Sequence, residues 1–259
     1  MLKRLLQLVL SFALVLAGTP VCLAQGLRIA AASDLQSALP AIAAQFEKDT
    51  GQRVRLTFGS SGNFFTQIQN GAPFDAFFSA DIDYPKRLEA SGRAERGSLY
   101  RYAIGRLVLW TRTDSGIDVT RGLSVLADTR VRRIAIANPE HAPYGRAAVA
   151  TLRHEGLYDR ARDKFVLGEN ISQAAQFADS GSADIGFLAL ALALSPTLKQ
   201  SGTYFAIPET WHPPIEQGAV VLTSSRQKPL ARQFIEFLKK PDIVRIVESY
   251  GFAVPQIVR

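Results

Sequence analysis

The segment Thr57–Asn70, TFGSSGNFFTQIQN, contains the transition that decides the fold. An apolar run ends at Phe58, the small residues of Gly59–Gly62 follow, and apolar residues with helical spacing begin at Asn63. The first N–H groups of a helix have no partner within it and carry partial positive charge, so this order of elements favours an anion. An isolated turn of this kind is more often an ordinary helix cap. An anion site is therefore predicted only if similar turns occur elsewhere in the chain.

Residues 1–24 have the features of a secretory signal peptide. Two basic residues precede the apolar run Leu5–Ala17, and the segment ends at the small residue Ala24. We expect cleavage near Ala24 and export to the periplasm. A membrane anchor is an alternative, but the run is short for a span. Lipidation of Cys22 is another, disfavoured because Val21 stands where a lipoprotein signal has a small residue.

Composition restricts the class of protein. Cys22 is the only cysteine, so a chain cleaved at Ala24 has no disulfide, thiol nucleophile or cysteine metal ligand and depends on a large core. The formal net charge of +7 is scattered. The densest basic segment, Arg130–Arg133, lacks the interleaved aromatic residues of a nucleic-acid surface, so no nucleic-acid partner is expected.

The chain after the signal peptide alternates strand and helix patterns, which predicts an α/β fold of parallel or mixed sheets flanked by helices. The expected strands are Leu27–Ala32, Arg53–Phe58, Phe74–Ser79, Tyr102–Thr111, Arg133–Ala137, Lys164–Leu167, Asp184–Leu188 and Ile215–Thr223. The expected helices are Asp34–Asp49, Asn63–Asn70, Tyr84–Ala90, Gly145–His154, Ser172–Asp179, Pro229–Lys239 and Asp242–Tyr250.

The length of the chain fits two lobes better than one sheet. We expect residues 25–105 with 220–259 to form lobe one and residues 106–219 to form lobe two. The long apolar runs Tyr102–Thr111 and Ile215–Thr223 are the expected crossings, because no low-complexity linker separates the lobes.

Four strand ends repeat the pattern of the opening segment. Ser33 follows the first strand and is expected to cap the next helix; Ser60, Ser61 and Asn63 follow the second. Residues 138–145 and 168–172 follow two strands of lobe two. Ligands in open α/β sheets bind beyond the carboxyl ends of strands, so two loops per lobe would surround a compact anion with N–H and O–H donors.

Enzyme motifs are absent from the sequence. It contains no nucleophile elbow, Walker loop or dinucleotide fingerprint, and His154-Glu155 is not followed by a second histidine at helical spacing. His141 lies in a candidate loop, where contact with a backbone or solvent is the commoner role. The remaining candidates have structural interpretations: packing in a turn for His212, caps and turns for Asp75, Asp81 and Asp83, and core or hinge packing for Arg106 and Trp110.

Four segments together resemble the periplasmic molybdate-binding proteins, the substrate-binding components of ABC importers. They are AAASDLQSALPAIAAQFEKDTG (30–51), FGSSGNFFTQIQNGAPFDAFFSAD (58–81), IANPEHAPYGRAA (136–148) and GENISQAAQFADSGSADIGF (168–187), with YGF at 250–252. The resemblance covers nearly the whole mature chain. It implies the type II periplasmic-binding-protein fold, with two lobes and two crossing hinge strands.

The resemblance also implies a ligand set for molybdate or tungstate. The oxyanion would be held by Ser33, by Ser61 with Ser60 beside it, by Tyr144 and by the N–H of Ile171; none would coordinate the metal atom directly. Some members have a tyrosine at the position of Ala189 and alanine in the third loop, so Tyr144 is expected to supply the phenolic donor instead.

Asp34 departs from members with a neutral residue at its position. A carboxylate beside a dianion is repulsive, so we expect the Asp34 side chain to turn away from the ligand and hold neighbouring backbone, while its N–H faces the ligand.

The expected function is capture of molybdate, without catalysis or a cofactor, by a monomer that delivers it to an ABC permease. The alternatives are a receptor for sulfate, phosphate or another oxyanion, a regulator's sensing domain, and an exported serine hydrolase.

Overall fold

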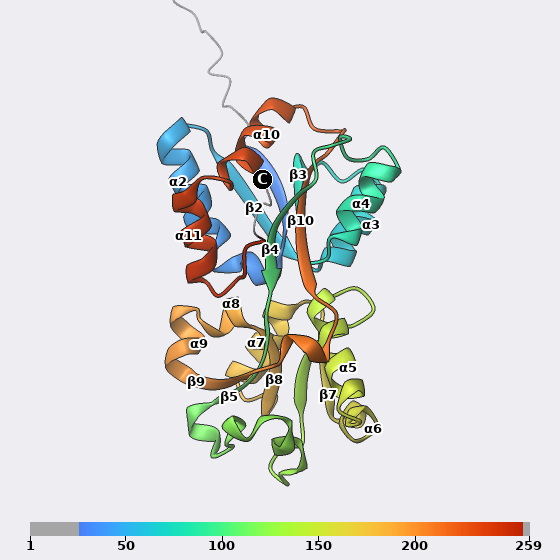
Figure 1. Cartoon of the computed structure of the whole chain (residues 1–259), viewed down its shortest axis with the longest axis vertical. Helices are drawn as coiled ribbons and strands as arrows, with labels where there is room; N and C mark the ends of the chain where they lie inside the picture. Colours follow the sequence, from blue (N-terminus) through green and yellow to red (C-terminus); the bar gives the residue numbers. More distant parts are fainter. Residues whose placement is uncertain (1–25, 256–259) are drawn as a thin grey trace, which may run out of the picture.

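The computed structural model describes residues 26–255, so the predicted signal peptide and Cys22 lie outside the described residues. Two lobes lie end to end along the long axis of the molecule (Figure 1). Each is built on a five-stranded mixed sheet flanked by helices, as the sequence predicts. Over residues 26–255 the structure has no helix whose length and apolar character would allow it to cross a membrane.

The sheet of lobe one has the order β2-β1-β3-β10-β4, in which β1 lies parallel to β2 and β3, and β10 is antiparallel to β3 and β4. Alternate residues of β1 pack into cores on opposite faces, Ile29 on one and Ala30 on the other. The strands are β1 (Leu27–Ala32), β2 (Val54–Gly59), β3 (Ala76–Ser79), β4 (Tyr100–Gly105) and β10 (Ile215–Val221). The helices are η1 (Ser33–Gln36), α2 (Leu39–Thr50), α3 (Ser61–Gln69), α4 (Asp83–Ala90), α10 (Lys228–Phe237) and α11 (Pro241–Ser249).

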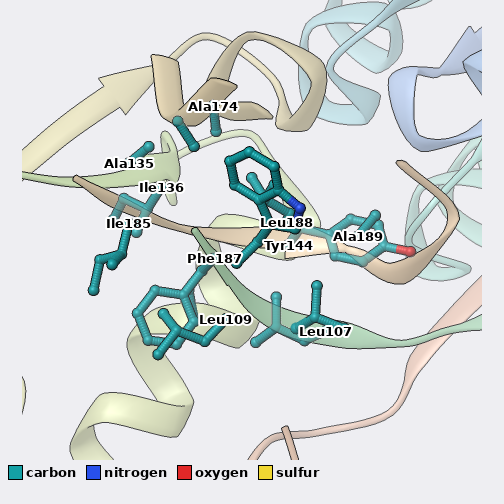
Figure 2. Close-up of a cluster of buried hydrophobic side chains, with 14 of the residues drawn as sticks. Leu107, Leu109, Ala135, Ile136, Tyr144, Ala174, Ile185, Phe187, Leu188 and Ala189 are labelled. Carbon is teal, nitrogen blue, oxygen red and sulfur yellow. The ribbon is translucent and has the colours of Figure 1, made fainter. Parts of the chain in front are cut away.

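The sheet of lobe two has the order β7-β6-β8-β5-β9, with β6 parallel to β7 and β8. Its core includes Leu109, Ile136 and Phe187, and Leu109 lies beside its strand partner Phe187 in Figure 2. The strands are β5 (Leu107–Arg112), β6 (Ile134–Ala137), β7 (Phe165–Gly168), β8 (Ile185–Ala189) and β9 (Gly202–Ala206). The helices are η2 (Thr113–Ser115), η3 (Val119–Ala127), α5 (Pro143–His154), α6 (Tyr158–Ala161), η4 (Arg162–Lys164), α7 (Ile171–Asp179), α8 (Leu190–Ala193), α9 (Pro196–Ser201) and η5 (Glu209–Trp211).

The chain crosses between the lobes in two places. The first crossing is at Arg106, which separates β4 from β5, so the expected strand Tyr102–Thr111 is divided between the two sheets. The second is the segment 207–214 between β9 and β10. All of β10 pairs with β3 and β4, whereas the predicted boundary at 219/220 cuts it. The sheet pairing therefore puts the division between lobes before Ile215.

The predicted helix Asp34–Asp49 is wrong in its first turns. Residues 33–36 form the short 3-10 helix η1, and the regular helix α2 begins only at Leu39. Pro40 lies in the first turn of α2, and since proline has no N–H and clashes with the preceding turn, a continuous helix is not possible there. Ser33 is accordingly the first residue of η1, with no capping bond to its own helix.

Candidate functional site

The loops after β1, β2, β6 and β7 meet between the lobes. In lobe one, Ser33 and Asp34 begin η1, Ser60 lies in the loop after β2, and Ser61 begins α3. Tyr144 and Ile171 reach the same place from the first turns of α5 and α7 in lobe two. All six line one cavity, together with Ala32, Gly59, Ala80, Ala142, Pro143 and Asn170.

The cavity is small and its lining is buried. The six predicted residues are each at most 4 % exposed. The space open to the centre of a water-sized sphere is about 10 Å³, roughly that of one water molecule, which excludes an extended organic ligand. The lining contains no lysine, arginine or histidine, so any anion would be held by neutral donors and helix N-termini.

Ser60 and Ser61 use their hydroxyls differently. The Ser60 hydroxyl donates to the carbonyl oxygen of His141 in lobe two at 2.6 Å, with His141 Nδ1 3.0 Å away. Ser61 Oγ accepts from the N–H of Ala80 at 3.0 Å, so its own hydrogen is available to the cavity. Ser60 thus joins the lobes, and the hydrogen bonds favour Ser61 as the hydroxyl donor to a ligand.

The opposite wall is the N-terminus of α7. Asn170 caps this helix, accepting from the N–H groups of Ser172 and Gln173 at 3.0 and 3.1 Å. Ser33 Oγ also accepts from Ser172 across the lobes at 3.4 Å, which leaves the Ser33 hydrogen free. Ile171, the first residue of α7, has no acceptor for its N–H within the helix. Both predicted donors are therefore unoccupied at the cavity wall.

Asp34 is held by a buried polar network. Its Oδ2 accepts from the Tyr144 hydroxyl at 2.9 Å and from Gln217 Nε2 at 2.5 Å. Gln217 Oε1 in turn accepts from the Tyr102 hydroxyl at 2.8 Å. The other carboxyl oxygen, Oδ1, is buried without a hydrogen-bond partner among the described residues. The network joins β4, β10, η1 and α5, and therefore both lobes.

Burial controls the titration of this network. Asp34 is fully buried, and desolvation raises the pKa of its carboxyl to about 6. The hydrogen bonds from Gln217 and Tyr144 act in the opposite direction, as do, more weakly, the nearby N–H groups of Asp34 and Leu35. Burial, together with the adjacent Asp34, raises the pKa of both Tyr102 and Tyr144 well above the usual value, so both stay protonated.

The expectation that Asp34 holds neighbouring backbone describes only part of its contacts. The N–H groups of Asp34 and Leu35 act weakly on the carboxyl, and its stronger hydrogen bonds come from two side chains in distant parts of the chain, Gln217 and Tyr144. The Tyr144 ring packs in the core of lobe two with Ala189, and its hydroxyl points away from that cluster (Figure 2). Without a ligand, that hydroxyl donates to Asp34.

Sequence reasoning missed Gln217. It is a fully buried amide in strand β10, at a register shift between Gln217 and Gly218. A polar amide directly before the apolar residues Gly218–Val221 of one strand is a usable signal, because an amide that is buried needs partners.

Further contacts hold the lobes together around the cavity. Arg146 of α5 forms an ion pair with Asp81 and contacts the Tyr84 hydroxyl at 3.4 Å. Asn63 donates to Glu169 at 3.1 Å. The structure is therefore a closed form of the two lobes.

Two glycines permit this closure. A Cβ on Gly62 would lie 2.7 Å from the carbonyl oxygen of His141, and the Gly62 N–H donates to that oxygen at 3.0 Å. A Cβ on Gly105 would lie 2.9 Å from Gln217 Nε2 and closer still to the Tyr144 hydroxyl. Gly62 thus lets the opposite lobe approach.

The other candidates have structural roles, of which two differ from the prediction: Asp75 is buried and accepts from the Arg28 N–H and the Ser225 hydroxyl, and Arg106 is exposed and pairs with Glu209. His141 contacts Ser60 and does not line the cavity, and His212 Nδ1 lies 2.8 Å from the carbonyl oxygen of Pro213. Asp81 accepts from the N–H of Asp83 in a turn, and Trp110 is in the core. Over residues 26–255, no group of three or more His, Cys, Asp or Glu side chains could hold a metal ion.

Comparison with known proteins is consistent with this geometry. A sequence model of the family described as bacterial extracellular solute-binding proteins matches residues 27–253. The molybdate-binding protein ModA of Azotobacter vinelandii is 39% identical over 92% of this chain and 94% of its own length. ModA of Rhodobacter capsulatus is 37% identical over 90% of this chain and 94% of its own. The chain belongs to the solute-binding family that includes these proteins.

Solved structures agree with this assignment. The periplasmic molybdate-binding protein of Azotobacter vinelandii superposes with a TM-score of 0.84 at 39% identity, covering 89% of this chain and 100% of that one. The resemblance to the molybdate-binding proteins and the two-lobed fold are both confirmed. The sulfate-binding protein SubI of Mycobacterium tuberculosis, 14% identical with a TM-score of 0.70 over 90% of each chain, shares the fold alone.

Proposed function

We propose that this protein captures molybdate, and also tungstate, in the cavity between its lobes and delivers it to an ABC permease. One observation carries the proposal: four loop ends from two lobes enclose a space for a single compact ion and line it with free hydroxyl and N–H donors. The same loops carry the segments shared with the molybdate-binding relatives.

In the proposed complex, Ser33 and Ser61 bind the oxyanion from lobe one, and Tyr144 and the Ile171 N–H bind it from lobe two. The Tyr144 hydroxyl turns from Asp34 to the ligand. Ser60 and Asp34 complete the wall. Because both lobes contact the anion, it stabilises the closed form and shifts the population toward it. Selectivity over sulfate rests on cavity size, since these tetrahedral dianions present the same acceptors.

The molybdate-binding relatives support a periplasmic setting, and the sequence pattern of residues 1–24 supports their removal. The protein acts in the periplasm as a monomer, after removal of residues 1–24, and its partners are the anion and an inner-membrane permease. It needs no cofactor and is not an enzyme. No histidine lines the cavity beside Ser33 and Ser61, and the Ser60 hydroxyl, although 3.0 Å from His141 Nδ1, donates to the carbonyl oxygen of His141 and not to its ring.

Calorimetric titration of the ligand-free protein with molybdate, tungstate, sulfate and phosphate tests this function. We expect tight binding of the first two anions at one site and far weaker binding of the others. Heat with sulfate or phosphate alone would reassign the ligand, and no heat with any of the four would refute the proposal.

A further inference from the structure

The cavity contains an acidic group where a dianion is expected. Asp34 is the only residue with an ionisable carboxyl in the lining, and no basic side chain lines the cavity with it. The nearest arginine on the neighbouring helix, Arg146, is engaged with Asp81 outside the lining. An ionised Asp34 beside a dianion would leave three negative charges in a closed space without a cation, which is strongly unfavourable.

The two oxygens of Asp34 have different surroundings. Oδ2 accepts two hydrogen bonds, from Tyr144 and Gln217, and these use its acceptor capacity. Oδ1 is buried and has no partner among the described residues. A neutral carboxylic acid fits this arrangement: Oδ2 would serve as the carbonyl oxygen, and Oδ1, near the N–H groups of Asp34 and Leu35, would carry the hydrogen.

We propose that Asp34 binds the oxyanion as a neutral acid, taking up one proton from solvent as the anion enters and donating it in a hydrogen bond from Oδ1. This proposal rests on the proposed function and makes Asp34 a direct ligand-binding residue. The proton converts a repulsive oxygen into a donor and leaves two negative charges in the cavity. No bond other than O–H forms, and the proton comes from the buffer.

Neutral Asp34 also explains how Tyr144 becomes available. A carbonyl oxygen is a weaker acceptor than a carboxylate oxygen, so Oδ2 can keep the Gln217 hydrogen bond while the Tyr144 hydroxyl rotates to the anion. One proton therefore provides two donors to the ligand. Gln217 acts as a positioning residue, because it keeps Oδ2 as the acceptor and Oδ1 as the protonated oxygen.

The surroundings of Asp34 permit this protonation. The pKa of the free carboxyl, about 6, means that it is largely ionised above neutral pH. The titratable groups that face it are Tyr144 on α5 and Tyr102 on β4, both neutral. The elements packed on η1 are α2, α7, α8, β1 and β2. None of the charged residues on these elements shifts the pKa of Asp34. On the strands, Arg28 pairs with Asp75 and Arg55 is exposed. On the helices, Glu47, Lys48 and Asp49 lie at the end of α2, Asp179 lies at the end of α7, and α8 has no charged residue.

The test is calorimetric titration with molybdate in two buffers of different ionisation enthalpy, such as HEPES and Tris, at several pH values. For the wild-type protein we expect uptake of about one proton per anion at about pH 8 and an affinity that falls roughly tenfold per pH unit above about pH 6.5. Asp34→Asn supplies an amide donor without a titrating group. It should bind molybdate with no proton uptake and with an affinity that changes less than about twofold over this range.

Asp83→Asn, an exposed carboxyl outside the cavity, is the matched control and should behave as wild type. Tight molybdate binding by the wild-type protein without proton uptake would overturn the proposal, as would full uptake by the Asp34→Asn variant. If that variant does not fold, the wild-type proton count decides alone. Absence of molybdate and tungstate binding would instead refute the proposed function, and the role of Asp34 with it.

Discussion

At the scale of single residues, Ser60 and Ser61 show how neighbours in one loop acquire separate roles. The Ser60 hydrogen is donated to His141 in the other lobe, whereas the Ser61 oxygen accepts from Ala80 and leaves its hydrogen free. A hydrogen bond to a buried charged oxygen is worth about 1.5–3 kcal/mol. Ser61→Ala should therefore weaken molybdate binding by roughly one to two decades in a calorimetric titration.

Ser60→Ala is the matched comparison for this prediction. It removes a contact between lobes and no donor to the ligand, so its loss of affinity should be smaller. An unchanged affinity in Ser61→Ala, or a larger loss in Ser60→Ala, would contradict the assignment of these two hydroxyls.

Asp34 makes the stability of the ligand-free protein depend on pH. Its pKa rises from 3.8 unfolded to about 6 folded, so between these values the folded state binds more protons than the unfolded state. The free energy of unfolding therefore falls as pH rises through this window. Asp34→Asn should increase it by up to about 3 kcal/mol near pH 7.5 and by nothing near pH 3.5.

Urea unfolding without ligand at both pH values measures this effect. Asp83→Asn, at an exposed position, should produce no such pH-dependent gain. An equal change at both pH values in Asp34→Asn would show that the effect comes from packing and not from the charge.

At the scale of elements, closure depends on α3 approaching the loop before α5. Gly62 lies in the first turn of α3, and a Cβ there would lie 2.7 Å from the carbonyl oxygen of His141. Gly62→Ala should fold normally but resist closure, and so lose at least about tenfold in molybdate affinity. Affinity by calorimetry and compaction by small-angle scattering measure the effect.

Gln67→Ala, exposed on the same helix, should leave both quantities unchanged. Wild-type affinity and compaction in Gly62→Ala would show that the His141 loop moves aside at no cost, and that this contact does not limit closure.

The sequence was a good guide to the elements with strong local patterns. Apolar runs in the sequence predicted the strands β1, β2 and β6. The residues that follow these runs predicted the loops that line the cavity. It failed at Pro40, a local signal that interrupts the first helix. It failed also where long-range contacts decide: β9 was not predicted, and Leu190–Ala193 continues the apolar pattern of β8 without a boundary.

The site was predicted as a set of loops and not as a network. Ser33, Ser61, Tyr144 and Ile171 follow from the resemblance, and the structure brings them to one cavity. The partners of Asp34 do not follow from local sequence, because Gln217 is 183 residues away and reaches it only through the pairing of β10 with β3 and β4. Whether a carboxyl contacts backbone or a distant amide is decided by tertiary packing.

At the scale of the whole molecule, the two lobes are joined at Arg106 and over residues 207–214, and their facing loops close around one small space. Interlobe bonds such as Asn63–Glu169 and the Asp81–Arg146 ion pair surround the cavity without entering it. In the proposed complex, the anion adds contacts from both sides and so increases the population of the closed form. A permease that binds the closed form would thereby favour the loaded protein.

The central claim is that the anion lies between the lobes at this cavity. Anomalous diffraction at the molybdenum absorption edge, from crystals grown with molybdate, tests it most directly. We predict one strong molybdenum peak in the space bounded by Ser33, Ser61, Tyr144 and Ile171. A well-ordered closed protein with no molybdenum there, or with its strongest peak elsewhere, would contradict the account.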